Sequence, residues 1–180
     1  IWMFKLDPKT GLRDYSVRYP LVHDSADPYY GVKVAGGYWN SGEGSYFVHR
    51  NGWWYLFMAY GWLGRTGGYQ IRLFRSRNLV GPYVDQNGNP AISNGEIPDN
   101  PTKAAGIRLT SSVKWSGGPA DDDTVEVSQG HNSVLTRGSD GRLFLTYHTR
   151  FIDRGDEDYE THVRELLPTD DGWLVAAPYE

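Results

Sequence analysis

One carboxylate in the sequence stands among small and aromatic side chains, and it is the first candidate for chemistry. Glu43 lies in the segment 38–47, which reads YWNSGEGSYF, where a strand is predicted to begin. These neighbours predict a desolvated carboxyl group, and because burial disfavours the charged form, it would raise the pKa of Glu43. Such a group suits proton donation near neutral pH. The alternative is an exposed glutamate in a glycine-rich turn, the usual place for this residue type.

The histidine of the segment 130–133, which reads GHNS, is the second candidate. His131 directly precedes a predicted strand. In the repeat of strands and turns described below, its position is equivalent to that of residues 44–45. If the fold is a propeller, this strand lines the central channel, and the imidazole is suited to an ion or an ordered water. The alternative is a histidine that serves the fold through hydrogen bonds.

A further group of residues could bind a carbohydrate. Arg150 ends a predicted strand and could fork onto sugar hydroxyls or a carboxylate, or form an ion pair between neighbouring sheets. Aromatic side chains that could stack on the apolar faces of sugars are Tyr38, Trp39, Trp53, Trp54, Tyr60 and Trp62. Packing between sheets is the alternative for these rings, and strand alternation allows only one of Trp53 and Trp54 on a given face.

Short strands joined by tight turns position these residues. Residues 46–49 and 53–60 flank Asn51-Gly52, a strong β-hairpin signal, and 69–76 follow as a third strand. The same order of strand, turn, strand, loop and strand returns over 132–172, at a spacing of about 90 residues. This repeat favours an all-β propeller over a β-sandwich, the main competing fold.

The predicted organisation is one domain of about two propeller blades plus an outer strand of a preceding blade. The ranges are 1–14 for the end of a blade, 15–43 for a loop, 44–87 for a blade, 88–130 for an insertion and loop, and 131–180 for the last blade. Two blades cannot close a ring without leaving exposed edges. The first residues, moreover, lie inside an apolar strand pattern without an initiator methionine. We therefore expect a further segment to complete the propeller.

Composition excludes several function classes. The 180 residues include 22 Gly, 10 Pro, 13 Tyr, 7 Trp and 6 Phe, a turn-rich and aromatic content that favours strands. A net charge of −4 without a basic tract argues against binding nucleic acid. The chain has no cysteine, which excludes disulfides, thiolate metal sites and thiol nucleophiles. The longest apolar run, 53–60, is far shorter than the roughly 18 residues of a membrane span.

Four motifs in order resemble glycoside hydrolase family 43, a family of five-bladed β-propellers that includes endo-α-1,5-L-arabinanases, α-L-arabinofuranosidases and β-xylosidases. They are EGSY at 43–46, GHNS at 130–133, YHTR at 147–150, and the stretch from DGW at 171 to APY ending at 179. The arabinanase branch is the most similar. The sequence departs from the family at Ser45, where proline is usual, which affects the turn after the carboxylate but not the carboxylate itself.

The resemblance implies a glycosidase that inverts configuration on α-1,5-linked arabinan. Glu43 would be the general acid, and His131 the protein ligand of a Ca²⁺ or similar hard cation that is otherwise held by water. The residues expected to contact substrate are Trp39, Tyr60, Trp62, Asn132, Ser133 and Arg150. Inversion also needs an aspartate base, and no aspartate of this chain suits the role, so we expect it on an N-terminal segment of the same propeller.

Two alternatives remain open from the sequence. One is an exo-acting α-L-arabinofuranosidase or β-xylosidase on the same scaffold, which would release single sugars. The other is a carbohydrate-binding propeller without catalysis. Because a polymeric arabinan cannot enter a cell, an endo-acting enzyme is expected to be secreted, periplasmic or bound to the cell surface.

Overall fold

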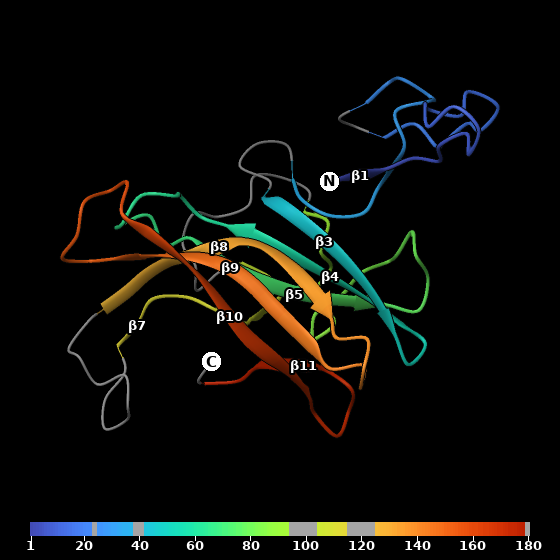
Figure 1. The fold of residues 1–180 in the computed structure, drawn as a ribbon. Helices are drawn as coiled ribbons and strands as arrows, with labels where there is room; N and C mark the ends of the chain where they lie inside the picture. Colours follow the sequence, from blue (N-terminus) through green and yellow to red (C-terminus); the bar gives the residue numbers. More distant parts are fainter. Residues whose placement is uncertain (23–24, 38–41, 94–103, 115–124, 179–180) are drawn as a thin grey trace.

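The computed structural model describes residues 1–22, 25–37, 42–93, 104–114 and 125–178, and every regular element in these ranges is a strand (Figure 1). The strands are β1 (Trp2–Met3), β2 (Val32–Lys33), β3 (Glu43–Arg50), β4 (Trp53–Tyr60), β5 (Gln70–Ser76), β6 (Ile107–Arg108), β7 (Val113–Lys114), β8 (Val125–Thr136), β9 (Leu143–Phe151), β10 (Tyr159–Pro168) and β11 (Leu174–Ala176). The predicted all-β class is confirmed. No helix in the described ranges is long and apolar enough to cross a membrane.

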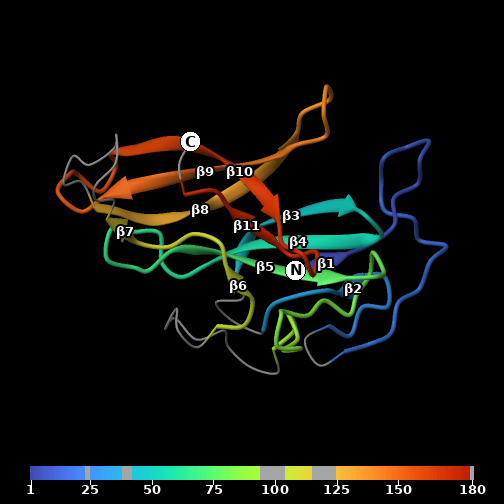
Figure 2. The same ribbon diagram turned by 90° about the horizontal axis from the view of Figure 1, so that it is seen from below.

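Two antiparallel sheets dominate the structure. The first has the strand order β3-β4-β5-β6, and the second has the order β11-β10-β9-β8-β7. The strands β1 and β2 form a separate pair. Figure 2 shows the two large sheets as stacked layers, with β8 and β9 above β3 and β4. In both sheets successive strands are neighbours, which is the arrangement within propeller blades.

Local turn chemistry sets the hairpins. Asn51 and Gly52 have φ angles of 51° and 74°, and positive φ at both central residues is the geometry of a type I′ turn between β3 and β4. Gly141 and Gly172, with φ of 71° and 79°, serve the turns before β9 and β11. The Asn51-Gly52 hairpin predicted from the sequence is therefore confirmed, and these two turns lie within the repeat predicted over 132–172.

The strand β4 has apolar side chains buried on both of its faces. Phe57 faces the second sheet and packs in a cluster with Leu73 and Leu145. Leu56 and Met58 face the other way and pack with residues that include Val34, Phe74 and Ala91. Because both faces of β4 are covered, its residues read in the sequence as one continuous apolar run rather than as an alternating pattern.

One face of the second sheet packs in the core, and part of its other face is exposed. Leu145 and Leu166 point into the core, whereas Leu135, Val163 and Leu167 belong to its exposed large apolar side chains. Val163 pairs with Thr146, and Ser133 pairs with the same residue from the other side, so these neighbours share the open face. This face thus exposes Leu135, Val163 and Leu167 beside polar groups such as the hydroxyls of Ser133 and Thr146.

An arginine between two tryptophans joins the sheets. The guanidinium carbon of Arg75 lies 4.1 Å from the ring centre of Trp53 and 3.9 Å from that of Trp173. The Arg75 side chain also donates a hydrogen bond to the carbonyl of Asp171 at 2.9 Å. Tyr55 from β4 donates to the carbonyl of Gly172 in the same turn. Trp53 therefore serves packing between sheets, one of the two alternatives drawn from the sequence.

The second sheet begins earlier than the sequence indicates. β8 starts at Val125, and β6 and β7 also lie in the stretch 88–130 that was expected to be an insertion and loop. Ser128 and His131 have positive φ angles of 53° and 52°, and the pairing of β8 with β9 shifts register twice around them. Such bulges break the alternation on which strand prediction depends. The strand start expected at residue 132 is therefore wrong.

The apolar strand pattern of the first residues gives only a short strand. Only Trp2–Met3 forms a strand, paired with Val32–Lys33, and Leu6 makes an isolated bridge to Arg13. The Asp7-Pro8 turn follows directly.

One buried carboxylate fixes the loop after β5. Asp85 accepts hydrogen bonds from the backbone N–H groups of Asn87 and Asn89 at 2.9 Å, and from the Asn89 amide and the N–H of Gly106 at 3.0 Å. Burial opposes ionisation, but the hydrogen bonds from Gly106, Asn89 and Asn87 outweigh it and lower the pKa of Asp85 below its usual value.

We expect Asp85→Asn to lower the free energy of unfolding by about 1–3 kcal/mol at pH 7, because it replaces an acceptor-only carboxylate by an amide that cannot satisfy all four donors. A lowered pKa gives stability that is present above the ordinary value of 3.8 and is lost as pH falls further. The difference in free energy of unfolding between wild type and variant, measured by urea denaturation, should therefore become smaller between pH 7 and pH 3. A gap that stays constant would contradict this role for the charge.

Candidate active site

Glu43 is the first residue of β3 and pairs with Ala59 on β4. Its side chain is 56% exposed, so the burial expected from the sequence is wrong for the chain as described. The physical reason is local, because the flanking residues Gly42 and Gly44, with φ angles of 84° and 57°, contribute no side chains that could cover it. The carboxylate is presented at the end of the sheet rather than enclosed in it.

A buried tyrosine holds this carboxylate. The phenol of Tyr69, immediately before β5, donates a hydrogen bond to Oε1 of Glu43. Burial, together with the adjacent Glu43 carboxylate, raises the pKa of Tyr69 above its usual range, so the phenol keeps its proton and remains a donor. Sequence reasoning missed Tyr69. The available signal was its place next to a strand that begins at the same end of the sheet as Glu43.

The position of Tyr69 depends on a glycine and a histidine. A Cβ atom at Gly130 would lie 2.1 Å from Cε1 of Tyr69, so only glycine leaves room for the ring. On the neighbouring strand His148 lies nearly parallel to Tyr69, with the ring centres 5.7 Å apart. Burial, followed by the charges of Arg150 and His131, lowers the pKa of His148, which favours a neutral imidazole. The Tyr69 ring is thus packed against groups that do not compete for Glu43.

His131 lies beside Glu43. Its Nδ1 is 3.4 Å from the Tyr69 oxygen and 3.8 Å from Oε1 of Glu43. The imidazole is 60% exposed, and its backbone lies in the left-handed region that non-glycine residues rarely adopt. The bulge in β8 therefore turns the His131 side chain out towards Glu43, and two residues 88 positions apart in sequence lie side by side.

The residues around His131 have few atoms that could hold a metal. In the ranges that the structure describes, no group of three or more histidine, aspartate or glutamate side chains is arranged so that it could hold a metal ion. His131 offers one exposed imidazole with the Glu43 carboxylate beside it. A hard cation here would take most of its ligands from water or from residues outside these ranges.

The three aromatic candidates have different surroundings. Tyr60 is buried, and its ring lies so close to Gly42 that a Cβ there would be 2.3 Å from Cε1. Its ring therefore packs against the backbone of Gly42, directly before Glu43, rather than offering an open face. Trp62 is 77% exposed at the same end of the sheet. Trp39 lies outside the described residues.

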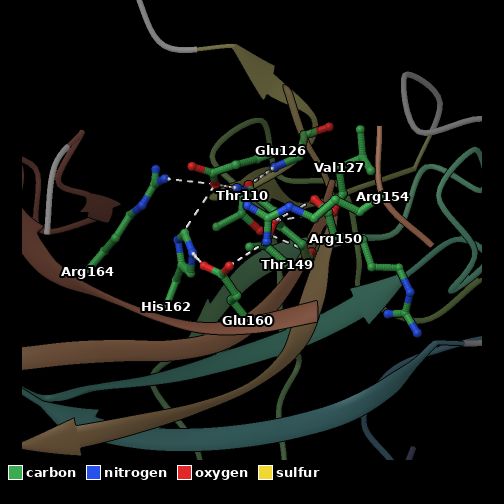
Figure 3. A network of polar contacts seen from close by, with 11 residues as sticks. Thr110, Glu126, Val127, Thr149, Arg150, Arg154, Glu160, His162 and Arg164 are labelled. Atoms are coloured by element: carbon green, nitrogen blue, oxygen red, sulfur yellow. Dashed lines mark hydrogen bonds and ion pairs between the residues drawn. The ribbon is translucent and has the colours of Figure 1, made fainter. Parts of the chain in front are cut away.

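Arg150 is buried in a polar cluster between β8, β9 and β10 (Figure 3). Its Nε donates to the carbonyl of Asp156 at 2.7 Å, and Tyr159 lies under the guanidinium at 5.4 Å. The side chain thus anchors the loop between β9 and β10. A direct contact with substrate, as expected from the sequence, remains a prediction.

The same cluster contains a buried carboxylate with two basic neighbours. Oε2 of Glu126 lies 3.5 Å from the Arg164 guanidinium and 3.8 Å from Nδ1 of His162 (Figure 3). Gln129 donates to the same oxygen at 2.5 Å and accepts from the N–H of Ser111 at 3.0 Å. These contacts fix the first half of β8, from which His131 projects.

Asn132 and Ser133 point to opposite sides of β8. The Asn132 side chain is buried, and neither of its amide atoms has a partner among the described residues, so a buried water is expected there. Ser133 is exposed, and its hydroxyl lies 2.6 Å from that of Thr146. Their proposed contact with substrate remains a prediction.

Comparisons with known proteins show that the chain is a part of a glycoside hydrolase. The chain matches the model of "Glycosyl hydrolases family 43" over residues 1–174. It is 37% identical, over 99% of its length, to the extracellular endo-α-(1→5)-L-arabinanase 2 of Bacillus subtilis (strain 168). It is 35% identical, again over 99%, to an extracellular endo-α-(1→5)-L-arabinanase of Thermotoga petrophila. The chain therefore belongs to glycosyl hydrolase family 43.

Solved structures define how much of the fold the chain supplies. It superimposes on the endo-1,5-α-L-arabinanase of Thermotoga petrophila RKU-1 in complex with Tris with a TM-score of 0.80 and 34% identity, covering 98% of this chain and 37% of that one. An α-L-arabinanase of Cellvibrio cellulosa, at 18% identity and a TM-score of 0.63, has the same fold. The chain spans 37% and 36% of the two curated relatives. It forms about two blades of a five-bladed β-propeller.

Proposed function

We propose that the protein is an inverting endo-arabinanase that cleaves α-1,5-linked L-arabinan, with Glu43 as general acid. The observation that supports this most directly is the combination of 37% and 35% identity to two arabinanases with an accessible carboxylate that accepts a hydrogen bond from Tyr69 and lies beside His131. Protonated Glu43 would transfer its proton to the departing glycosidic oxygen while a water attacks the opposite face of the sugar.

We propose that the general base is an aspartate of a companion N-terminal segment of the propeller. Inversion needs a water between base and sugar, hence two carboxyl groups roughly 6.5–9.5 Å apart. The chain spans 37% of the Bacillus relative, which leaves room for such a segment. The exposed side chains of Leu135, Val163 and Leu167 offer apolar contacts for such a segment. On this proposal residues 1–180 alone do not hydrolyse arabinan.

His131 is the residue proposed to hold a hard cation such as Ca²⁺. Its exposed imidazole, with the Glu43 carboxylate 3.8 Å away, fits an ion whose other ligands are mostly water. When bound, the ion would supply positive charge beside the acid. Metal analysis of the native protein and of His131→Ala would test this, because only the native protein should retain a stoichiometric ion after dialysis.

The test of the proposed function follows the products of linear arabinan over time by chromatography. An endo-acting enzyme releases a mixture of oligosaccharides early, whereas release of a single sugar from the outset would identify the exo-acting alternative. The native protein and residues 1–180 alone should be compared. Binding of arabinan without turnover by the native protein would overturn catalysis and favour a carbohydrate-binding propeller. Since both curated relatives are named extracellular, we propose secretion.

The hydrogen bond from Tyr69 supplies a further prediction. Tyr69→Phe removes the donor that orients Glu43 but keeps the ring that fills the space beside Gly130. A hydrogen bond to a charged group contributes about 1.5–3 kcal/mol, so kcat on arabinan should fall by about 10- to 100-fold with little change in KM. Unchanged kcat in a correctly folded variant would remove Tyr69 from the site.

A further inference from the structure

Residues 61–68, in the loop between β4 and β5, present the Trp62 indole to solvent on a backbone held by hydrogen bonds. The N–H of Trp62 donates to the carbonyl of Gly67 at 3.0 Å, and the N–H of Gly67 donates to that of Gly64 at 2.9 Å. The indole lies by Gly64, where a Cβ would be 3.4 Å from Cδ1 and Nε1. These contacts hold the backbone of Trp62 while its side chain stays 77% exposed.

An ion pair fastens this loop to the neighbouring sheet. Nε of Arg65 donates to Oδ1 of Asp156 at 2.8 Å, and its NH1 donates to the carbonyl of Ile152 at 3.1 Å. Both acceptors belong to the loop between β9 and β10, and Figure 1 shows the two loops at the same end of the molecule. Arg150 holds Asp156 from within the cluster described above. The two loops are thereby joined into one unit.

A hydrogen bond from β8 also fixes this loop. The hydroxyl of Ser128 donates to the carbonyl of Gly64 at 2.5 Å. Ser128 is fully buried in the first half of β8, with a positive φ that directs it to this acceptor. An exposed ion pair such as Arg65 with Asp156 adds little stability by itself. With Ser128, its main effect is on the position of the loop.

The loop leads directly into Tyr69, the residue that contacts Glu43. Trp62 forms a bridge with Gly68, and the residue after Gly68 is Tyr69, whose phenol donates to Glu43. A Cβ at Gly61 would lie 2.6 Å from the carbonyl oxygen of Gly68, so the two ends of the loop approach too closely for a side chain there. A sugar chain whose cleaved bond lies at Glu43 would therefore pass close to the indole.

We propose that Trp62 is a stacking platform for one ring of the sugar chain away from the cleaved bond, and that Arg65 and Asp156 are positioning residues that hold it there. This inference rests on the proposed function, which supplies a chain-like arabinan substrate. An exposed aromatic face can pack on the apolar face of a sugar ring. Because hydrogen bonds already hold the backbone of residues 61–68, less conformational entropy is lost when the sugar binds.

The experiment measures kcat and KM of the native protein on linear arabinan and on arabino-oligosaccharides of increasing length. Trp62→Ala, Arg65→Ala, Asp156→Ala and the double variant Arg65→Ala/Asp156→Ala are compared. In Trp62→Ala, KM for arabinan should rise by about three- to tenfold while kcat stays the same. The rise in KM should be larger for longer substrates. The two single positioning variants should show a similar effect, and the double variant no more than either.

Arg137→Ala is the matched control, because it breaks another exposed ion pair, with Asp140, in the turn between β8 and β9. It should leave both kinetic parameters unchanged. An unchanged KM in Trp62→Ala, or a loss in kcat alone, would overturn the inference while leaving the proposed function intact. If the native protein does not hydrolyse arabinan, the proposed function fails, and calorimetric titration with an arabino-oligosaccharide decides the inference: equal affinity of wild type and Trp62→Ala overturns it.

Discussion

Glu43→Gln in the native protein is expected to lower kcat on linear arabinan by about 10²- to 10⁴-fold, the range that a positioned general acid contributes. Glutamine keeps the shape of the side chain and an oxygen that can accept from the Tyr69 phenol, but it has no proton to give to the leaving oxygen. Because Glu43 is exposed at the sheet end, this loss should come without a loss of folding.

Substrates with different leaving groups make this prediction specific. An aryl arabinoside with an acidic phenol as leaving group needs little protonation. Glu43→Gln should therefore lower its rate of hydrolysis much less than that of arabinan. Asp170→Asn is a matched control, since it makes the same carboxylate-to-amide change in an exposed turn before β11. Equal losses on both substrates would indicate a binding role for Glu43, and unchanged arabinan hydrolysis would remove it from the mechanism.

The parts of the structure that sequence reasoning predicted are those encoded locally. Asn51-Gly52 specifies its hairpin through the positive φ angles that these two residue types tolerate, whatever packs around them. The repeat of the hairpin unit indicated the blades because each blade uses the same local signals. The same repeat aligned His131 with residues 44–45, and in the structure His131 on β8 lies beside Glu43 on β3.

The parts that sequence reasoning missed depend on contacts between distant segments. Tyr69 reaches Glu43 only because β4 and β5 return the chain to the same end of the sheet, and no local pattern marks its phenol as a donor. The predicted burial of Glu43 failed because composition counts aromatic neighbours but not their directions. Tyr46, for example, is itself an exposed residue. The early part of β8 escaped notice because two positive φ angles interrupt its alternation.

The junction between the two blades gives the second large prediction. Trp173→Ala should lower the free energy of unfolding by about 3–5 kcal/mol, the range for deleting a buried aromatic side chain. Trp173 is 6% exposed, packs in the core shared by both sheets, and covers the Arg75 guanidinium at 3.9 Å. Its removal would leave a cavity at the junction and uncover one side of that cation. Because a domain is stable by only about 5–15 kcal/mol, the loss should be plain in denaturant unfolding.

Two further variants separate the contributions at this junction. Trp62→Ala makes the same chemical change at a side chain that is 77% exposed, and it should alter the free energy of unfolding by no more than about 0.5 kcal/mol. Arg75→Ala keeps both indoles but removes the cation between them and its hydrogen bond to the Asp171 carbonyl, so it should cost less than Trp173→Ala. If Trp173→Ala and Trp62→Ala proved equally mild, the two sheets would not be held together through this contact, and the core of Phe57, Leu73 and Leu145 would have to maintain the junction alone.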